Sequence, residues 1–65
     1  MDYFLSFDYW TETKNKFWNG IVNVDLRDTS LQQVCRDAIA NMNHDEHKDT
    51  WAVKVLSFNN VNINQ

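Results

Sequence analysis

Cysteine and glycine each occur only once in this 65-residue sequence, and each scarcity excludes a kind of site. Because Cys35 is the only cysteine, no disulfide can form within the chain. One glycine, Gly20, is too few for the glycine-rich loops that bind phosphate at a helix N-terminus. The sequence therefore predicts neither a disulfide-stabilised scaffold nor a phosphate-binding loop of that kind.

Positive charge and long apolar runs are also scarce. Six Lys and Arg residues stand against nine Asp and Glu residues, which gives a formal net charge of −3. No basic stripe is present for a phosphate backbone, so we expect no nucleic-acid partner. No apolar run approaches the ~18–20 residues of a membrane span, and the N-terminus lacks the pattern of a signal peptide. We therefore expect a protein of the reducing cytoplasm, without a membrane partner.

Aromatic residues, by contrast, are abundant. The chain has three Trp, two Tyr and four Phe residues, and 43% of its residues are hydrophobic. A chain of this length forms one domain, residues 1–65, near the lower limit for a stable core. Each aromatic side chain can bury on the order of 150–250 Å². One sheet under one helix is not expected to cover them all, and homodimerisation would cover the remainder.

Two segments, residues 3–11 and 17–27, alternate with the period of a half-buried strand. The polar residues between them predict a hairpin with a Glu12–Asn15 loop, in which Thr11 pairs with Lys16. Gly20 is expected to make room for Trp18 or for a helix. In this register Trp10 faces Phe17, Ser6 faces Ile21 and Phe4 faces Asn23, so the apolar sets of the two strands coincide.

A helix is predicted at about residues 30–43, because apolar side chains recur with helical spacing along one stripe. Thr29 with Gln32, or Ser30 with Gln33, fits a capping box at its start. The polar residues 43–50 are expected to form the helix end and a loop. The apolar stripe consists of Leu31, Val34, Cys35, Ala38, Ile39 and Met42.

A third strand is predicted over residues 51–58, and residues 59–65 are expected to fray, extend it or add a short strand. Alternation places Trp51, Val53 and Val55 on one face and Ala52, Lys54, Leu56 and Phe58 on the other. A right-handed crossover by the helix makes this strand antiparallel to the first and pairs it beside the first. The predicted fold is α+β, ββαβ, with a three-stranded antiparallel-type sheet of order 2-1-3. One helix covers one face and packs on Tyr3, Leu5, Phe7, Tyr9, Trp18, Val22 and Val24.

The other face of the sheet is the main candidate site. One helix covers one face only, so the opposite face is expected to present an apolar centre with a polar rim, as protein interfaces do. The alternative is a surface with a few scattered hydrophobic side chains. The predicted interface comprises Phe4, Trp10, Phe17, Ile21, Leu56 and Phe58, with Asp8, Asn23 and Lys54 at the rim. Its partner would be a protein or a second copy of the chain.

Other candidate sites are weaker. His44 and His47 share a face if they lie on a helical turn, which makes a small Zn²⁺- or Ni²⁺-binding protein one alternative. Cys35 lies on the buried stripe without a neighbouring base, as a core residue would, and Ser6 and Ser57 have no visible base partner. We therefore expect no enzyme activity, no catalytic residue and no cofactor. An acidic mimic of nucleic acid is a further alternative, although the acidic residues are scattered along the chain.

Four segments carry a resemblance in residue pattern to a known group. They are Tyr3-Phe4-Leu5-Ser6-Phe7, Gly20-Ile21-Val22-Asn23-Val24, the Thr29-Ser30-Leu31 helix start, and the closing Val53-Lys54-Val55-Leu56-Ser57-Phe58 strand. Together they resemble small phage and prophage proteins of uncharacterised function, over most of the chain. The resemblance implies an accessory protein of a mobile element that binds a host or phage protein. It transfers no catalytic or binding residue.

Overall fold

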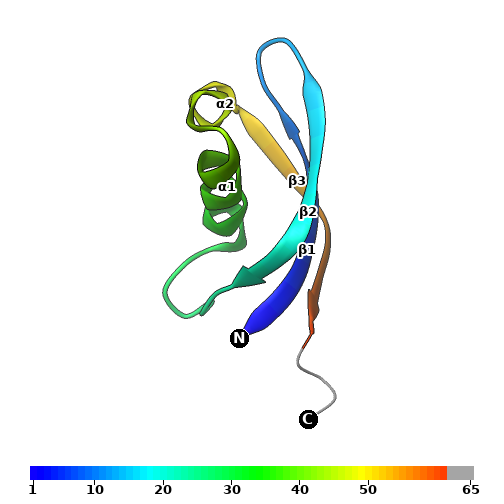
Figure 1. Cartoon of the computed structure of the whole chain (residues 1–65), viewed down its shortest axis with the longest axis vertical. Helices are drawn as coiled ribbons and strands as arrows, with labels where there is room; N and C mark the ends of the chain where they lie inside the picture. The colour runs from blue at the N-terminus through cyan, green and yellow to red at the C-terminus, as the bar shows by residue number, and fades with distance from the viewer. Residues whose placement is uncertain (62–65) are drawn as a thin grey trace.

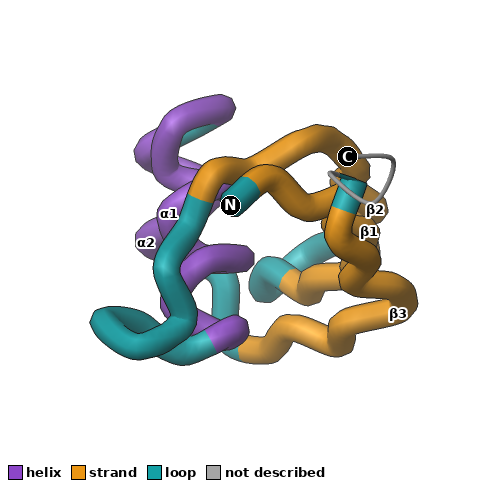
Figure 2. Tube along the Cα trace, turned by 90° about the horizontal axis from the view of Figure 1, so that it is seen from below, coloured by secondary structure: helices purple, strands orange, loops and turns teal. Residues whose placement is uncertain are grey.

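A computed structural model describes residues 1–61 and shows an antiparallel sheet with helices on one face only (Figures 1 and 2). The elements are β1 (Asp2–Trp10), β2 (Asn15–Asn23), α1 (Leu31–Met42), α2 (His44–Asp49) and β3 (Ala52–Asn60). The strand order is β2-β1-β3, and both outer strands run antiparallel to β1. The predicted α+β class and 2-1-3 order are confirmed. Of the predicted tail, residues 59 and 60 belong to β3, and residues 62–65 lie outside the described residues.

The hairpin register differs from the prediction by two residues. The Thr11 backbone N–H donates to the Lys14 carbonyl at 2.9 Å, and the Lys14 N–H donates to Thr11 Oγ1 at 3.2 Å. This tight closure places Phe4 opposite Ile21 instead of Asn23, so the predicted Thr11–Lys16 pairing is wrong. Side chains alternate with a period of two, and a shift of two residues therefore leaves each one on its predicted face.

The strand β2 also ends earlier than predicted, at Asn23. The next residues turn: the Asp28 N–H donates to the Asp25 carbonyl at 3.0 Å, and the Arg27 N–H donates to Asp25 Oδ1 at 3.0 Å. Local hydrogen bonds of an aspartate compete with a strand ladder in this way. Leu26, which falls within the predicted strand of residues 17–27, therefore lies in the turn, and 43% of it is exposed.

The helix α1 begins where the capping signal predicts. Ser30 Oγ accepts from the Gln33 N–H at 3.1 Å, which satisfies one donor of the first turn. The Gln33 side chain donates to Asp37 instead of returning to the cap, so only half of the capping box forms. Met42, predicted on the buried stripe, is 52% exposed because it lies in the last turn, where the chain passes into α2.

The polar segment after α1 forms a second short helix, α2, where a loop was predicted. Asn43 explains the new start, because its Oδ1 accepts from the N–H groups of Asp45 and Glu46 at 3.1 and 3.2 Å. Acidic residues follow in the first turn and His47 and Lys48 in the last, an order that suits the helix dipole. This helix has no fully buried residue.

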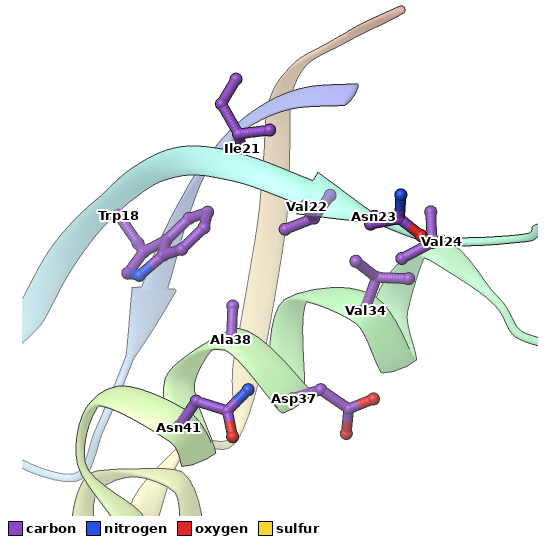
Figure 3. Close-up of a pocket in the computed structure, with 9 residues that line it drawn as sticks. All are labelled: Trp18, Ile21, Val22, Asn23, Val24, Val34, Asp37, Ala38 and Asn41. Carbon is purple, nitrogen blue, oxygen red and sulfur yellow. The ribbon is translucent and has the colours of Figure 1, made fainter. Parts of the chain in front are cut away.

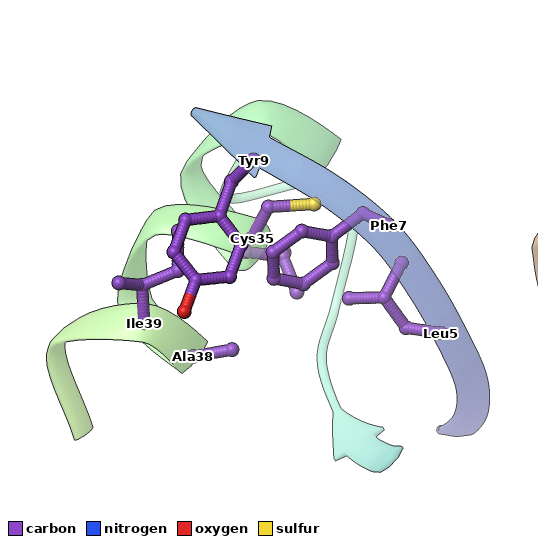
Figure 4. Close-up of a cluster of buried hydrophobic side chains, with 7 residues drawn as sticks. Leu5, Phe7, Tyr9, Cys35, Ala38 and Ile39 are labelled. Carbon is purple, nitrogen blue, oxygen red and sulfur yellow. The ribbon is translucent and has the colours of Figure 1, made fainter. Parts of the chain in front are cut away.

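The core lies between β1 and α1 (Figure 4). Phe7 is fully buried at its centre, with its ring stacked 5.3 Å from Trp18 and tilted 5.9 Å from Tyr9. Gly20 leaves room for this arrangement, since a Cβ at that position would lie 2.9 Å from Cη2 of Trp18. The buried residues are Leu5, Phe7, Tyr9, Val34, Cys35, Ala38 and Ile39, and Trp18, Val22, Val24, Leu31, Val53, Val55 and Phe58 pack against them.

Candidate binding surface on the open sheet face

The central strand β1 divides its side chains between two faces. Leu5, Phe7 and Tyr9 face α1 and are buried, whereas Phe4, Asp8 and Trp10 alternate with them and point to the other side. Within the described part of the chain no helix covers that other side, which we call the open face (Figure 2). The open face consists of Asp2, Phe4, Ser6, Asp8 and Trp10 of β1 with Asn15, Phe17, Asn19, Ile21 and Asn23 of β2 and Ala52, Lys54, Ser57 and Asn59 of β3.

Large apolar side chains remain accessible on the open face. Phe4 and Ile21 are cross-strand neighbours and are 36% and 59% exposed, and Phe17, four residues from Ile21 on β2, is 55% exposed. Phe17 lies opposite Asp8, not opposite Trp10 as predicted. The apolar residues therefore follow β2 and reach the central strand at Phe4.

Two opposite charges lie together in the middle of the open face. Asp8 of β1 is the direct neighbour of Lys54 on β3, and cross-strand pairs of opposite charge favour a sheet modestly. Both residues were predicted at the rim, and the structure places them in the middle of the open face, where Asp8 also lies opposite Phe17. With Asp2, the open face carries two negative charges and one positive charge. Asp8 of one copy can pair with Lys54 of another when two open faces meet.

Trp10 ends the open face beside the hairpin loop. Its ring lies 6.4 Å from the ring of Trp51, and the Trp51 indole N–H donates to the Thr11 carbonyl at 3.0 Å. Trp10 is therefore partly buried, while 66% of Trp51 is exposed. The exposed aromatic area at this end belongs mostly to Trp51, a residue that the predicted interface did not include.

Phe58 does not belong to the open face, and its predicted place in the interface is wrong. A β-bulge between Ser57 and Val55 leaves Leu56 without a partner on β1, so the alternation of β3 reverses at that point. Phe58 pairs with Leu5, stacks on Tyr3 with ring centroids 4.3 Å apart, and packs against the core. Leu56 itself is 49% exposed.

Polar groups fill the remaining positions of the open face. Ser6 is 7% exposed, and its hydroxyl shares a hydrogen bond of 2.6 Å with the hydroxyl of Ser57. Asn23, predicted at the rim, donates from Nδ2 to Asp2 Oδ1 at 2.6 Å. The two serine hydroxyls therefore satisfy each other across the β1–β3 pair.

A hydrogen-bonded group of three polar side chains lies on the helix side, and no pattern in the sequence indicates it. The buried Tyr9 hydroxyl donates to Glu46 Oε1 at 2.8 Å, and Lys16 Nζ pairs with Glu46 Oε2. Desolvation and the adjacent carboxylate raise the pKa of Tyr9 to about 12, and the bonds from Lys16 and Tyr9 lower the pKa of Glu46. This triad joins β1, β2 and α2, and no bound group is needed to explain it.

The triad predicts a loss of stability at both ends of the pH range. Because the pKa of Glu46 is lowered on folding, its contribution is present above the ordinary value of 4.5 and is lost as the pH falls through the folded pKa. The pKa of Tyr9 is raised, so its contribution is present below pH 10.0 and is lost as the pH rises towards about 12. We expect Glu46→Gln to reduce the loss of unfolding free energy at low pH, and Tyr9→Phe to reduce the loss at high pH. Urea unfolding followed by tryptophan fluorescence measures both. Identical pH profiles for wild type and variants would contradict this.

The two histidines lie close together on α2, with ring centroids 6.2 Å apart. No group of three or more His, Cys, Asp or Glu side chains arranged for a metal occurs among residues 1–61.

The second alternative is an acidic mimic of nucleic acid, which needs carboxylates without bound cations. Two carboxylates already form ion pairs: Glu46 pairs with Lys16, and Asp25 pairs with Arg27 at 2.8 Å. Burial raises the pKa of the Cys35 thiol to about 11, as expected for an inert core residue.

A groove of about 370 Å³ lies on the helix side, between β2 and α1 (Figure 3). Trp18 and Val22 point into it from the strand, and Ala38 and Asp37 border it on the helix, while Ile21 points away. The sequence did not indicate this groove, because it depends on how far α1 stands from the outer strand.

Comparisons with known proteins give no relative: no protein family, no curated protein and no solved structure matches this chain. Over the described range no helix has the length and apolar character needed to cross a membrane.

Proposed function

We propose that this chain is a non-enzymatic protein-binding module whose contact surface is the open face. The observation that carries the proposal is the exposure of large apolar side chains where no element within residues 1–61 covers them. Phe17 and Ile21 are more than half exposed, at 55% and 59%, and Phe4 adds 36% beside them. Exposed apolar patches with polar surroundings mark contact sites in soluble proteins.

The composition of the open face supports a protein partner, and in the first place a second copy. Asp8 and Lys54 present one charge of each sign next to the apolar residues, so two copies can meet with opposite charges facing. Asn19 and Asn23 supply polar edges around the apolar part. The proposal places this contact in a reducing cytoplasm, which suits the single buried Cys35.

The resemblance to small phage and prophage proteins supports a more specific version of the proposal. In that version the chain is an accessory protein of a mobile element, and its partner is a host or phage protein. Affinity capture from the native host lysate with mass-spectrometric identification would name that partner.

The open face is tested by the double variant Phe4→Ser with Trp10→Ser. Both residues lie on the central strand, so the change removes apolar surface without altering an outer edge of the sheet. We expect a lower particle mass in light scattering, or the loss of captured partners, because the apolar centre of the contact is removed. Leu26→Ser is the matched control, since Leu26 is 43% exposed in the turn outside the open face.

Far-UV circular dichroism must show that both variants keep the fold. If the double variant changes neither the particle mass nor the set of captured proteins, the open face is not a contact surface. If Leu26→Ser has the same effect as the double variant, the loss comes from general hydrophobicity, and the proposal also fails.

A further inference from the structure

The two outer edges of the sheet differ in how they are protected. On β3, the bulge at Leu56 interrupts the edge, and Gln32 Nε2 of α1 donates to the Val53 carbonyl at 3.3 Å. Bulges and covering elements are the usual means of preventing one sheet from pairing with another. The β3 edge is therefore blocked by its own chain.

The edge of β2 has none of these protections. The chain contains no proline, β2 has no bulge, and between Phe17 and Asn23 it carries no charged residue. Within residues 1–61 no strand other than β1 pairs with β2. A long and regular edge whose only charged residue, Lys16, is paired with Glu46 is a template for another strand.

The backbone groups that β2 offers follow from its ladder with β1. The Thr11 N–H bonds to the Lys14 carbonyl, and the Val24 N–H bonds to the Met1 carbonyl, so even-numbered residues of β2 turn their backbone groups towards β1. The odd-numbered residues therefore direct their N–H and C=O groups to the outer edge. These residues are Asn15, Phe17, Asn19, Ile21 and Asn23.

We propose that a second copy of this chain pairs antiparallel along the outer edge of β2, with the two-fold axis at Asn19, to form one six-stranded sheet. Asn19 is the middle residue of β2, so this register uses the whole strand. Asn19 then faces its own copy, Phe17 faces the partner's Ile21, and Asn15 faces the partner's Asn23. Apolar residues meet apolar ones and amides meet amides on the open face, which is the matching that stabilises cross-strand pairs.

The helix side accepts the same register. Trp18 lies opposite the partner's Gly20, over which the partner's own Trp18 ring packs, so the two indoles come near each other on the helix side. The partner's Lys16 lies beside Val22 and keeps its ion pair with Glu46 of its own chain. No like charges face each other along the paired strands, and on the open face each Phe17 contacts the partner's Ile21 side by side.

The proposed pairing goes beyond the binding role of the open face, because it uses backbone groups at an edge. It would also join the two open faces into one surface. A single cysteine at position 19 tests the register directly, since a residue on the two-fold axis meets its own copy. Facing residues of a hydrogen-bonded pair have Cα atoms about 5.5 Å apart, within the range of a disulfide.

The experiment compares Asn19→Cys with Asn23→Cys in the full chain, with diamide as the oxidant that takes the two electrons and two protons released by the two thiols. We expect Asn19→Cys to form a disulfide-linked dimer at least tenfold faster than Asn23→Cys, as followed on non-reducing gels. In the proposed register the two copies of position 23 lie about 27 Å apart, at ~3.4 Å per residue. The native Cys35 is fully buried and does not compete. Equal rates for the two variants would overturn the proposal.

A second pair of variants tests the edge without cysteine. Asn19→Pro removes the outward N–H and blocks a new strand, whereas Asn19→Ala removes only the side chain. We expect sedimentation velocity to show a dimer for wild type and for Asn19→Ala. For Asn19→Pro we expect the dissociation constant of the dimer to rise at least tenfold. A dimer that persists in Asn19→Pro but is lost in the Phe4→Ser and Trp10→Ser double variant would overturn edge pairing and support the open face instead. If Asn19→Pro fails to fold, the cysteine rates alone decide.

Discussion

Replacing Phe7 by alanine is expected to unfold most of the protein at room temperature. Phe7 is 0% exposed, lies in the middle of the central strand and stacks on Trp18. Truncation of a buried phenylalanine costs about 3–5 kcal/mol, and a domain of this size has a core that rarely supplies more than ~3–5 kcal/mol in total. Urea unfolding followed by circular dichroism measures the loss.

The control for Phe7 is Phe17→Ala, the same substitution on the open face. Phe17 is 55% exposed, so its truncation is expected to cost about 1 kcal/mol or less in the monomer. A loss for Phe17→Ala as large as that for Phe7→Ala would contradict the assignment of the two faces.

The second large effect is expected at Ile39, which joins α1 to the sheet. Ile39 is fully buried against β1, and truncation of such a residue to alanine costs about 2–5 kcal/mol. Met42 belongs to the same apolar stripe in the sequence, yet it is 52% exposed. Because alanine is also the better helix former, Met42→Ala is expected to change stability by only about 0.5 kcal/mol.

Thermal unfolding of the two helix variants tests whether Met42 is buried, as the periodic pattern predicts, or exposed, as in the structure. If Met42→Ala and Ile39→Ala lower the free energy of unfolding equally, α1 extends onto the sheet through its last turn, and the break between α1 and α2 is wrong. A difference of about 2 kcal/mol or more between them supports the described packing.

The candidate contact regions are related through β2. Its side chains supply Phe17 and Ile21 to the open face, and its other side borders the groove with Trp18 and Val22. Its outer edge pairs with no other strand of the described part of the chain. The open face binds through side chains and the edge through the backbone, so their variants separate cleanly. Central-strand substitutions test the first and a proline at position 19 tests the second.

Several features of the fold follow from local pattern alone. The alternation in β1 and β2 places Leu5 and Phe7 under the helix and Phe4 on the opposite face, as the structure confirms. The apolar stripe and the cap at Ser30 predict α1 to within one residue at each end. These signals are readable because each depends on neighbours in the sequence and on one period.

Other features have no local signal. The hairpin register changes no side chain's face when it shifts by two residues, so the pattern could not distinguish Phe4 opposite Ile21 from Phe4 opposite Asn23. The bulge at Leu56 moves Phe58 from the predicted interface to the core, and it arises from pairing with β1. The bond from Tyr9 to Glu46 joins residues 37 positions apart.

The sequence by itself determined the composition of each strand face, the position of the main helix and the shortage of cover for the aromatic residues, because these depend on spacing along one chain. Only the tertiary structure decided which aromatic residues stay exposed, which sheet edge its own chain blocks and where α1 leaves a groove beside β2. Those outcomes depend on register, on a single inserted residue and on the distance between packed elements, and all three are fixed by contacts between distant parts of the chain.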